Sequence, residues 1–167
     1  MQMPSLSSLF KRTDRNAGWF AIGISNGGVY FARIRLSGSR PCVERCTFHE
    51  LEEVTPAALE KLRKDTRVGN FHFITLLGPG EYQMLMVDVP NVPLGELKTA
   101  VRWRIKDNLT YHVDDATVDV LQIPPRNSGE RPQSLYAIAA SNDTVRKRIA
   151  LFEQARIDLS VIDIPET

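Results

Sequence analysis

The segment FAIGISNGGVYFARIRL, residues 20–36, predicts a β-hairpin. Two apolar runs flank the turn sequence Asn26-Gly27-Gly28, and asparagine and glycine tolerate the positive φ angles of tight hairpin turns. A further run, residues 42–51, follows a Ser-Gly-Ser-Arg-Pro turn and is again rich in β-branched and aromatic residues. The folded part of the chain is therefore predicted to begin with a three-stranded meander.

The remaining pattern alternates between helices and strands. Thr55 and Pro56 predict the start of a helix, as a capping residue followed by a proline in the first turn. A second and longest helix is expected over residues 94–109, and a third, capped by Ser141 or Asn142, carries Val145, Ile149 and Phe152. Strands are expected over residues 71–77, 82–90, 116–123, 134–140 and 159–165. This mixture of elements predicts an α+β fold.

Composition restricts the functions that this chain can have. The 167 residues include 43% hydrophobic residues, 21 Lys and Arg, and 20 Asp and Glu. The net charge of +1 gives no general attraction to nucleic acid, and no basic stripe is interleaved with aromatic residues. No apolar run reaches the roughly 20 residues that span a bilayer, and no signal peptide is visible. We therefore expect a cytoplasmic protein, whose first residues form either a frayed tail or a short helix on a membrane surface.

The two cysteines, Cys42 and Cys46, lie four residues apart in the third strand. On a regular strand they would face the same side about 13 Å apart, which is too far for a disulfide. A zinc site would need two more ligands, and His49 is the only nearby candidate. We expect free thiols and no metal site.

No catalytic residue emerges from the sequence. Asp114 and Asp115 are adjacent, but neighbours on an extended chain point to opposite faces. His72 and His112 are interpreted as structural histidines, and no serine or cysteine nucleophile has a recognisable base nearby. We expect a protein without enzymatic activity.

Two stretches carry a family resemblance. Residues 93–124 contain RWRIKD followed by YHVDDATVDVL, and this region resembles the MshI family of MSHA pilus biogenesis proteins. That family is related to the type IV pilus assembly protein PilM and to the cell-division protein FtsA. Residues 136–165 resemble the strand–helix–strand with which those proteins re-enter their actin-like core.

The resemblance implies a partial actin-like, ribonuclease H-like core with an inserted strand–helix–strand–strand module. Residues 1–18 would be a flexible tail, residues 19–77 the first part of the core, residues 78–157 the inserted module, and residues 158–167 a strand that returns to the core. Actin-like proteins also contain a second half with another phosphate loop. We expect this chain to be a piece of a longer protein or a naturally reduced relative.

The resemblance also assigns a meaning to the first turn, Ser25, Asn26, Gly27 and Gly28. In nucleotide-binding relatives an acidic residue before this turn positions the metal, and the turn amides face the phosphates. Here that acidic position is occupied by Gly23, and no carboxylate lies between Asp14 and Glu44. The amides could still hold an anion, but we expect no cofactor and no ATP hydrolysis.

The helix over residues 94–109 provides the candidate partner-binding residues. Its apolar stripe includes Leu97, Val101 and Ile105, and Trp103 lies on the far side, where either another part of the chain or a partner would cover it. The candidate residues are Lys98, Arg102, Trp103 and Lys106.

By resemblance, the chain would be a cytoplasmic adaptor at the inner-membrane face, in an MSHA-type or type IV pilus machine or the related type II secretion system. It would bind a PilN-like membrane partner in a groove between its two modules, with residues 89–97 and the surroundings of Trp103 as the first positions to test. Its association with the membrane would be indirect. Two alternatives are an actin-like ATPase whose second half lies outside this chain and a self-associating FtsA-like scaffold.

Overall fold

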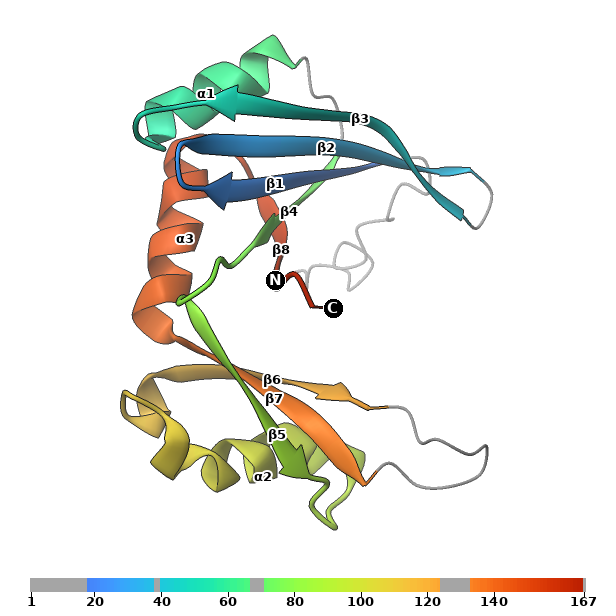
Figure 1. Ribbon diagram of the computed structural model, residues 1–167, viewed down its shortest axis with the longest axis vertical. Coiled ribbons are helices and arrows are strands. Elements are labelled where there is room, and N and C mark those ends of the chain that lie inside the picture. The colour runs from blue at the N-terminus through green and yellow to red at the C-terminus, as the bar shows by residue number, and fades with distance from the viewer. Residues whose placement is uncertain (1–17, 38–39, 67–70, 124–132, 167) are drawn as a thin grey trace, which may run out of the picture.

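The computed structural model describes residues 18–37, 40–66, 71–123 and 133–166. The predicted tail lies outside these residues, except for Gly18. Within the described residues the chain forms two modules, each built on its own β-sheet (Figure 1). The larger module occupies the upper half of the view, the smaller module lies below it, and helix α3 (Asn142–Gln154) runs along one side.

The larger module contains the predicted meander. Across the five-stranded sheet the strands follow the order β3 (Arg40–Glu50), β2 (Gly28–Ser37), β1 (Trp19–Ser25), β4 (His72–Leu76) and β8 (Leu159–Asp163). Strands β1, β2 and β3 are antiparallel neighbours, whereas β4 is parallel to β1 and β8 is parallel to β4. The meander predicted from the sequence is confirmed.

Two helices cover one face of the larger sheet. Phe20 and Ile22 of β1 and Phe31 of β2 are buried in a cluster with Leu59 of α1 (Pro56–Asp65) and Phe152 of α3. The alternation along β1 and β2 sends every second side chain to this face. Helix α1 begins as predicted, because the Thr55 side chain accepts a hydrogen bond from the Ala58 amide at 3.2 Å and Pro56 occupies the first turn.

The smaller module has a three-stranded antiparallel sheet in the order β5 (Tyr82–Asp88), β7 (Ser134–Ser141) and β6 (Ala116–Gln122). Helix α2 (Leu97–Arg104) covers one face of it. Leu97, Val101 and Ile105 pack there against Leu135, Ala137 and Ala139. This is the predicted sequence of strand, helix, strand and strand.

The helix expected over residues 94–109 is shorter than predicted. The structure divides it into a 3-10 turn (Leu94–Glu96), the α-helix α2 and a second 3-10 turn (Lys106–Asn108), and another 3-10 turn (Val113–Asp115) follows before β6. Gly95 disfavours a helical start. At the other end, the Asn108 amide donates to the Ile105 carbonyl at 2.9 Å, which tightens the last turn. Within the described part of the chain the longest helix is α3, with 13 residues.

Helix α3 packs with the larger module, although the predicted division at residue 157 assigned it to the inserted module. Its Phe152 and the following Ala155 and Ile157 belong to the core of the larger sheet. The reason is that β7 passes directly into α3: Ser141 ends the strand and its side chain caps the helix by accepting from the Thr144 amide at 3.0 Å. The inserted part therefore ends at this residue by its packing.

A β-bulge in β3 overturns the expectation that the two cysteines face the same side. Val43 lies opposite Ile34 and Arg45 opposite Arg33, so Glu44 is an extra residue in β3. One extra residue reverses the alternation. Cys42, opposite Arg35, and Cys46, opposite Ala32, therefore lie on opposite faces. Both thiols are free and exposed.

The corrected limits of α2 predict different effects for two leucines that share the sequence pattern. Leu97 is 5% exposed and Leu94 is 80% exposed. Leu97→Ala is expected to lower the free energy of unfolding by about 2–5 kcal/mol, because it removes buried apolar contacts. The same change at Leu94 is expected to cost less than about 0.5 kcal/mol. Urea denaturation measures both, and equal losses would contradict the assignment.

Candidate partner-binding groove

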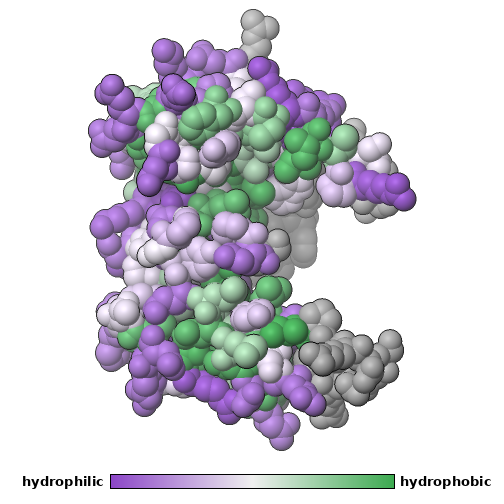
Figure 2. Space-filling view, viewed as in Figure 1, coloured by the Kyte–Doolittle hydropathy of each residue, from purple (hydrophilic) through white to green (hydrophobic). Residues whose placement is uncertain are grey.

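A groove of about 260 Å³ lies between the two modules. Its lining comes from β6, β7, α3, and the ends of β4 and β8. The lining residues are Leu77, Thr117, Asp119, Val120, Leu121, Ile138, Ala140, Val145, Ile162, Asp163 and Ile164. Figure 2 shows hydrophobic side chains gathered over the smaller module, in the lower half of the view. The groove is thus an apolar surface to which both modules contribute.

Two sheet edges border the groove. β6 is the last strand of the smaller sheet and β8 is the last strand of the larger one. Among the described residues, each has a neighbour in its own sheet on one side only. A strand edge offers backbone groups with which another extended segment can pair. Extended peptides commonly bind by adding a strand to such an edge while their side chains enter adjacent pockets.

The polar groups in the lining are acidic or neutral. Asp119 accepts a hydrogen bond from the Val120 amide at 2.7 Å, and Asp163 accepts one from the Ile164 amide at 2.8 Å. The lining includes no lysine or arginine, although Lys98 reaches Asp119 from α2 at 2.7 Å. This chemistry favours an apolar segment that carries a positive charge over an acidic one.

A tyrosine and a glutamate join the modules beside the groove. Tyr82, at the start of β5, donates to the Glu166 carboxylate, and its hydroxyl lies 2.7 and 2.6 Å from the two carboxylate oxygens. This hydrogen bond, assisted by desolvation and by the negative charge, raises the pKa of the Tyr82 phenol above its ordinary value. Below that pKa the neutral phenol can donate, so the contact persists at neutral pH.

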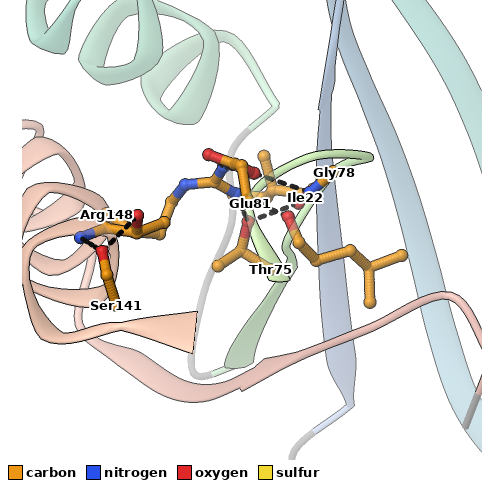
Figure 3. Close-up of polar contacts among 8 residues, drawn as sticks. Ile22, Thr75, Gly78, Glu81, Ser141 and Arg148 are labelled. Atoms are coloured by element: carbon orange, nitrogen blue, oxygen red, sulfur yellow. Dashed lines mark hydrogen bonds and ion pairs between the residues drawn. The ribbon is translucent and has the colours of Figure 1, made fainter. Parts of the chain in front are cut away.

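A buried arginine lies at the junction of the modules (Figure 3). The Arg148 side chain is 7% exposed and points from α3 toward β4 and toward the turn that leads to β5. Its Nη2 lies 2.8 and 2.6 Å from the two carboxylate oxygens of Glu81. Its Nη1 donates to the Leu76 carbonyl and, at 3.3 Å, to the Thr75 hydroxyl. The guanidinium charge is thus paired and hydrogen-bonded, as a buried cation requires.

Arg148 was missed by the sequence analysis, which assigned Val145, Ile149 and Phe152 to the apolar side of this helix. Ile149 is 38% exposed, whereas Arg148 is buried. The available signal was spacing: Arg148 follows Val145 by three residues and precedes Phe152 by four, which places an arginine on the apolar stripe. The lining residues of the groove gave no comparable signal, because each fits the ordinary pattern of its own strand, helix or strand end.

The predicted partner-binding residues lie on the α2 side of the smaller sheet. Trp103 is 55% exposed, and Lys106 is exposed beside it. Lys98 pairs with Asp119, and Arg102 donates from Nε and Nη2 to the Val113 carbonyl at 3.0 and 2.7 Å. Helix α2 packs on the face of β7 that carries Ala137 and Ala139, and Ile138 faces the groove. Arg102, Trp103 and Lys106 thus lie away from the groove, whereas Lys98 reaches it through its ion pair with Asp119.

Ser25, Asn26, Gly27 and Gly28 form the turn between β1 and β2. Gly27 has a φ of 89°, and its carbonyl accepts from the Leu51 amide at 2.9 Å. A side chain at Gly28 would clash with the His49 carbonyl, so the end of β3 packs closely against the turn. These contacts give the turn glycines a structural role in the meander.

The other candidate residues have ordinary environments. The His72 ring lies 5.0 Å from the Trp19 ring, and its Nδ1 lies 3.4 Å from the Ser160 hydroxyl. His112 Nδ1 accepts from the Asp114 amide at 3.3 Å. Across the described residues, no group of three or more His, Cys, Asp or Glu side chains is placed to hold a metal ion. None of the helices in those residues is long and apolar enough to cross a membrane.

Comparison with known proteins places the fold. No protein-family model and no curated protein sequence matches the chain. Among solved structures, it is similar to the "PilM-PilN type IV pilus biogenesis complex", with a TM-score of 0.71 and 19% identity over 89% of this chain and 47% of that one. It has a partial actin-like fold.

A second structure supports the same fold. The cytoplasmic domain of EpsL, an inner-membrane component of the type II secretion system of Vibrio cholerae, gives a TM-score of 0.63 and 10% identity over 89% of this chain and 57% of that one. A Bacteroides thetaiotaomicron protein with an actin-like ATPase fold matches at a TM-score of 0.45 and 9% identity, over 93% of this chain and 55% of its own. The chain thus spans about half the length of these structures.

The contact between Tyr82 and Glu166 predicts a measurable titration. Glu166→Ala is expected to lower the pKa of Tyr82, because it removes both the hydrogen-bond acceptor and the negative charge that raise it. The contact stabilises the fold below pH 10, and that contribution is lost as the pH rises through the folded-state pKa. Carbon-13 NMR of labelled tyrosine measures the shift. Tyr111 is the control, since burial alone raises its pKa. An unchanged Tyr82 pKa would contradict the contact.

Proposed function

We propose that this chain is a non-enzymatic adaptor of a type IV pilus or type II secretion machine. It acts on the cytoplasmic side of the inner membrane and binds a short, extended segment of a membrane partner in the groove between its modules. The observation that carries this proposal is the groove itself: an apolar surface shared by both modules and bordered by β6 and β8, the outer strands of the two described sheets.

The similar structures support a role in assembly. One contains PilM with PilN and the other is a cytoplasmic domain of an inner-membrane secretion component. A partner of the PilN type is the natural candidate by analogy, since an extended cytoplasmic tail fits a groove with strand edges. Asp163 in the lining suits a tail that combines apolar side chains with a basic residue, whereas Asp119 is already paired with Lys98.

The finer assignment, to an MSHA-type pilus, rests on the resemblance of residues 93–124 and 136–165 to the MshI family.

The proposal that the chain uses no nucleotide rests on the first turn. No carboxylate precedes it in β1, so the group that positions a metal in nucleotide-binding relatives has no counterpart there. The turn glycines instead accommodate the close packing of β3.

A titration calorimetry experiment tests the proposal with a synthetic peptide of the cytoplasmic tail of the PilN-like protein from the same organism. Leu121→Arg places a bulky cation in the groove and is expected to weaken binding about tenfold or more. Met86→Arg is the matched control. Met86 is 67% exposed on the same face of the smaller sheet, outside the groove lining, and its replacement is expected to leave the affinity unchanged.

Trp103→Ala distinguishes the groove from the α2 surface. The groove proposal predicts that this variant binds the peptide like the wild type. Loss of binding in Trp103→Ala with normal binding in Leu121→Arg would move the site to α2. If the folded wild-type chain does not bind the peptide, the adaptor proposal fails for this part of the protein.

A further inference from the structure

The smaller module is attached to the larger one through two short connections. The first is the turn Gly78–Glu81, in which the Glu81 amide donates to the Gly78 carbonyl at 3.1 Å and Gly80 has a φ of 85°. The second has no loop, because Ser141 ends β7 and caps α3. Two connections define an axis, and the modules can rotate about that axis unless side chains across the junction prevent it.

The side-chain contacts across this junction differ in burial. Tyr82 donates a hydrogen bond to the Glu166 carboxylate, and Thr117 of β6 donates one to Asn142 Oδ1 at 2.8 Å. Both of these contacts are exposed. Exposed polar contacts contribute little to holding a geometry. The contact of Arg148 with Glu81 differs, because the arginine side chain is 7% exposed. Among these polar contacts it is the best shielded from water, although the Glu81 side chain is 36% exposed.

The network around Arg148 reaches both sides of the junction. The Thr75 hydroxyl, which accepts from Arg148, donates to the Ile22 carbonyl at 2.8 Å, so the arginine is tied to β4 and through it to β1. On the other side, Glu81 Oε2 accepts from the Gly78 amide at 2.6 Å and closes the turn. The guanidinium thus holds the turn before β5 against the end of β4 and against α3 (Figure 3).

We propose that the ion pair of Arg148 and Glu81 fixes the angle between the two modules and thereby sets the shape of the groove. Neither residue lines the groove, so both act as positioning residues for the partner. The groove depends on this angle because one wall is formed by β6 and β7 and the other by the ends of β4 and β8. The effect on partner affinity rests on the proposed function, whereas the effect on the angle does not.

The fork geometry of arginine makes this role specific to the residue type. One nitrogen serves the carboxylate and the other serves the carbonyl and hydroxyl of β4, which a single ammonium group cannot reproduce. Arg148→Lys keeps the charge and loses the fork. Glu81→Gln keeps the shape and loses the charge. The two variants test the same contact from its two sides.

Spin-label distance measurements test the angle directly. Cys46→Ser leaves Cys42 as the single native cysteine, and Thr99→Cys adds the second labelling site. One spin label is attached at each of these two positions. These exposed positions lie on the larger and the smaller module. The distance distribution is expected to broaden or shift in Arg148→Lys and in Glu81→Gln. Lys147→Met is the matched control: it removes the adjacent cation of α3, whose pair with Asp143 is exposed, and is expected to leave the distribution unchanged.

The same variants are titrated with the peptide of the PilN-like cytoplasmic tail, below their melting temperatures. Arg148→Lys and Glu81→Gln are each expected to lower the affinity for the peptide about tenfold, which is a typical size for the coupling between two sites in a protein. Lys147→Met is expected to bind the peptide with the affinity of the wild type. An unchanged distance distribution in both folded variants would overturn the proposal. So would an altered distribution with unchanged affinity, since the angle would then not govern the groove. If the wild type does not bind the peptide, the adaptor function fails, while the distances still decide whether the ion pair fixes the angle.

Discussion

The arrangement of this protein depends on one buried cation. Arg148 lies on the apolar stripe of α3, where an unpaired charge would be strongly destabilising, and three kinds of acceptor meet it: a carboxylate, a carbonyl and a hydroxyl. Those acceptors belong to β4 and to the turn that leaves it. Satisfying the arginine therefore requires the helix, the end of the strand and the turn to come together in one geometry. Because a buried ion pair adds little net stability, we infer that this one contributes mainly conformational specificity.

The groove follows from the way in which each sheet is covered. Helices α1 and α3 cover one face of the larger sheet, and α2 covers one face of the smaller sheet. Where the modules meet, a third apolar cluster contains Leu77, Ala140 and Ile164, and the groove opens over these residues. The binding surface is therefore a property of the junction. The two modules have to be placed correctly before the surface exists.

Local signals in the sequence predicted much of this fold. Asn26-Gly27 marked the first turn, and Thr55-Pro56 marked the start of α1. The spacing of Leu97, Val101 and Ile105 identified the buried side of α2. Each of these features is decided by a few neighbouring residues, so the sequence pattern is sufficient. The family resemblance then suggested how the strands and helices are combined, and the strand order agrees with a partial actin-like core.

The features that were missed depend on partners distant in the sequence. The extra residue Glu44 in β3 is defined by its register against β2, and its carboxylate pairs with Arg33 and Arg35 of that strand. Arg148 is buried because residues about 70 positions earlier in the chain supply its acceptors, as the separation of 72 residues from Leu76 shows. The groove is likewise assembled from strands that the pattern describes one at a time.

The most direct test of the proposed groove is amide hydrogen exchange of the wild-type chain with and without the peptide of the PilN-like cytoplasmic tail. The peptide is predicted to protect the amides of β6, Ala116–Gln122, and of residues 159–164, while those of α2 exchange as before. Protection confined to α2, with β6 and β8 unchanged, would contradict the account and place the partner on the opposite face of the smaller module.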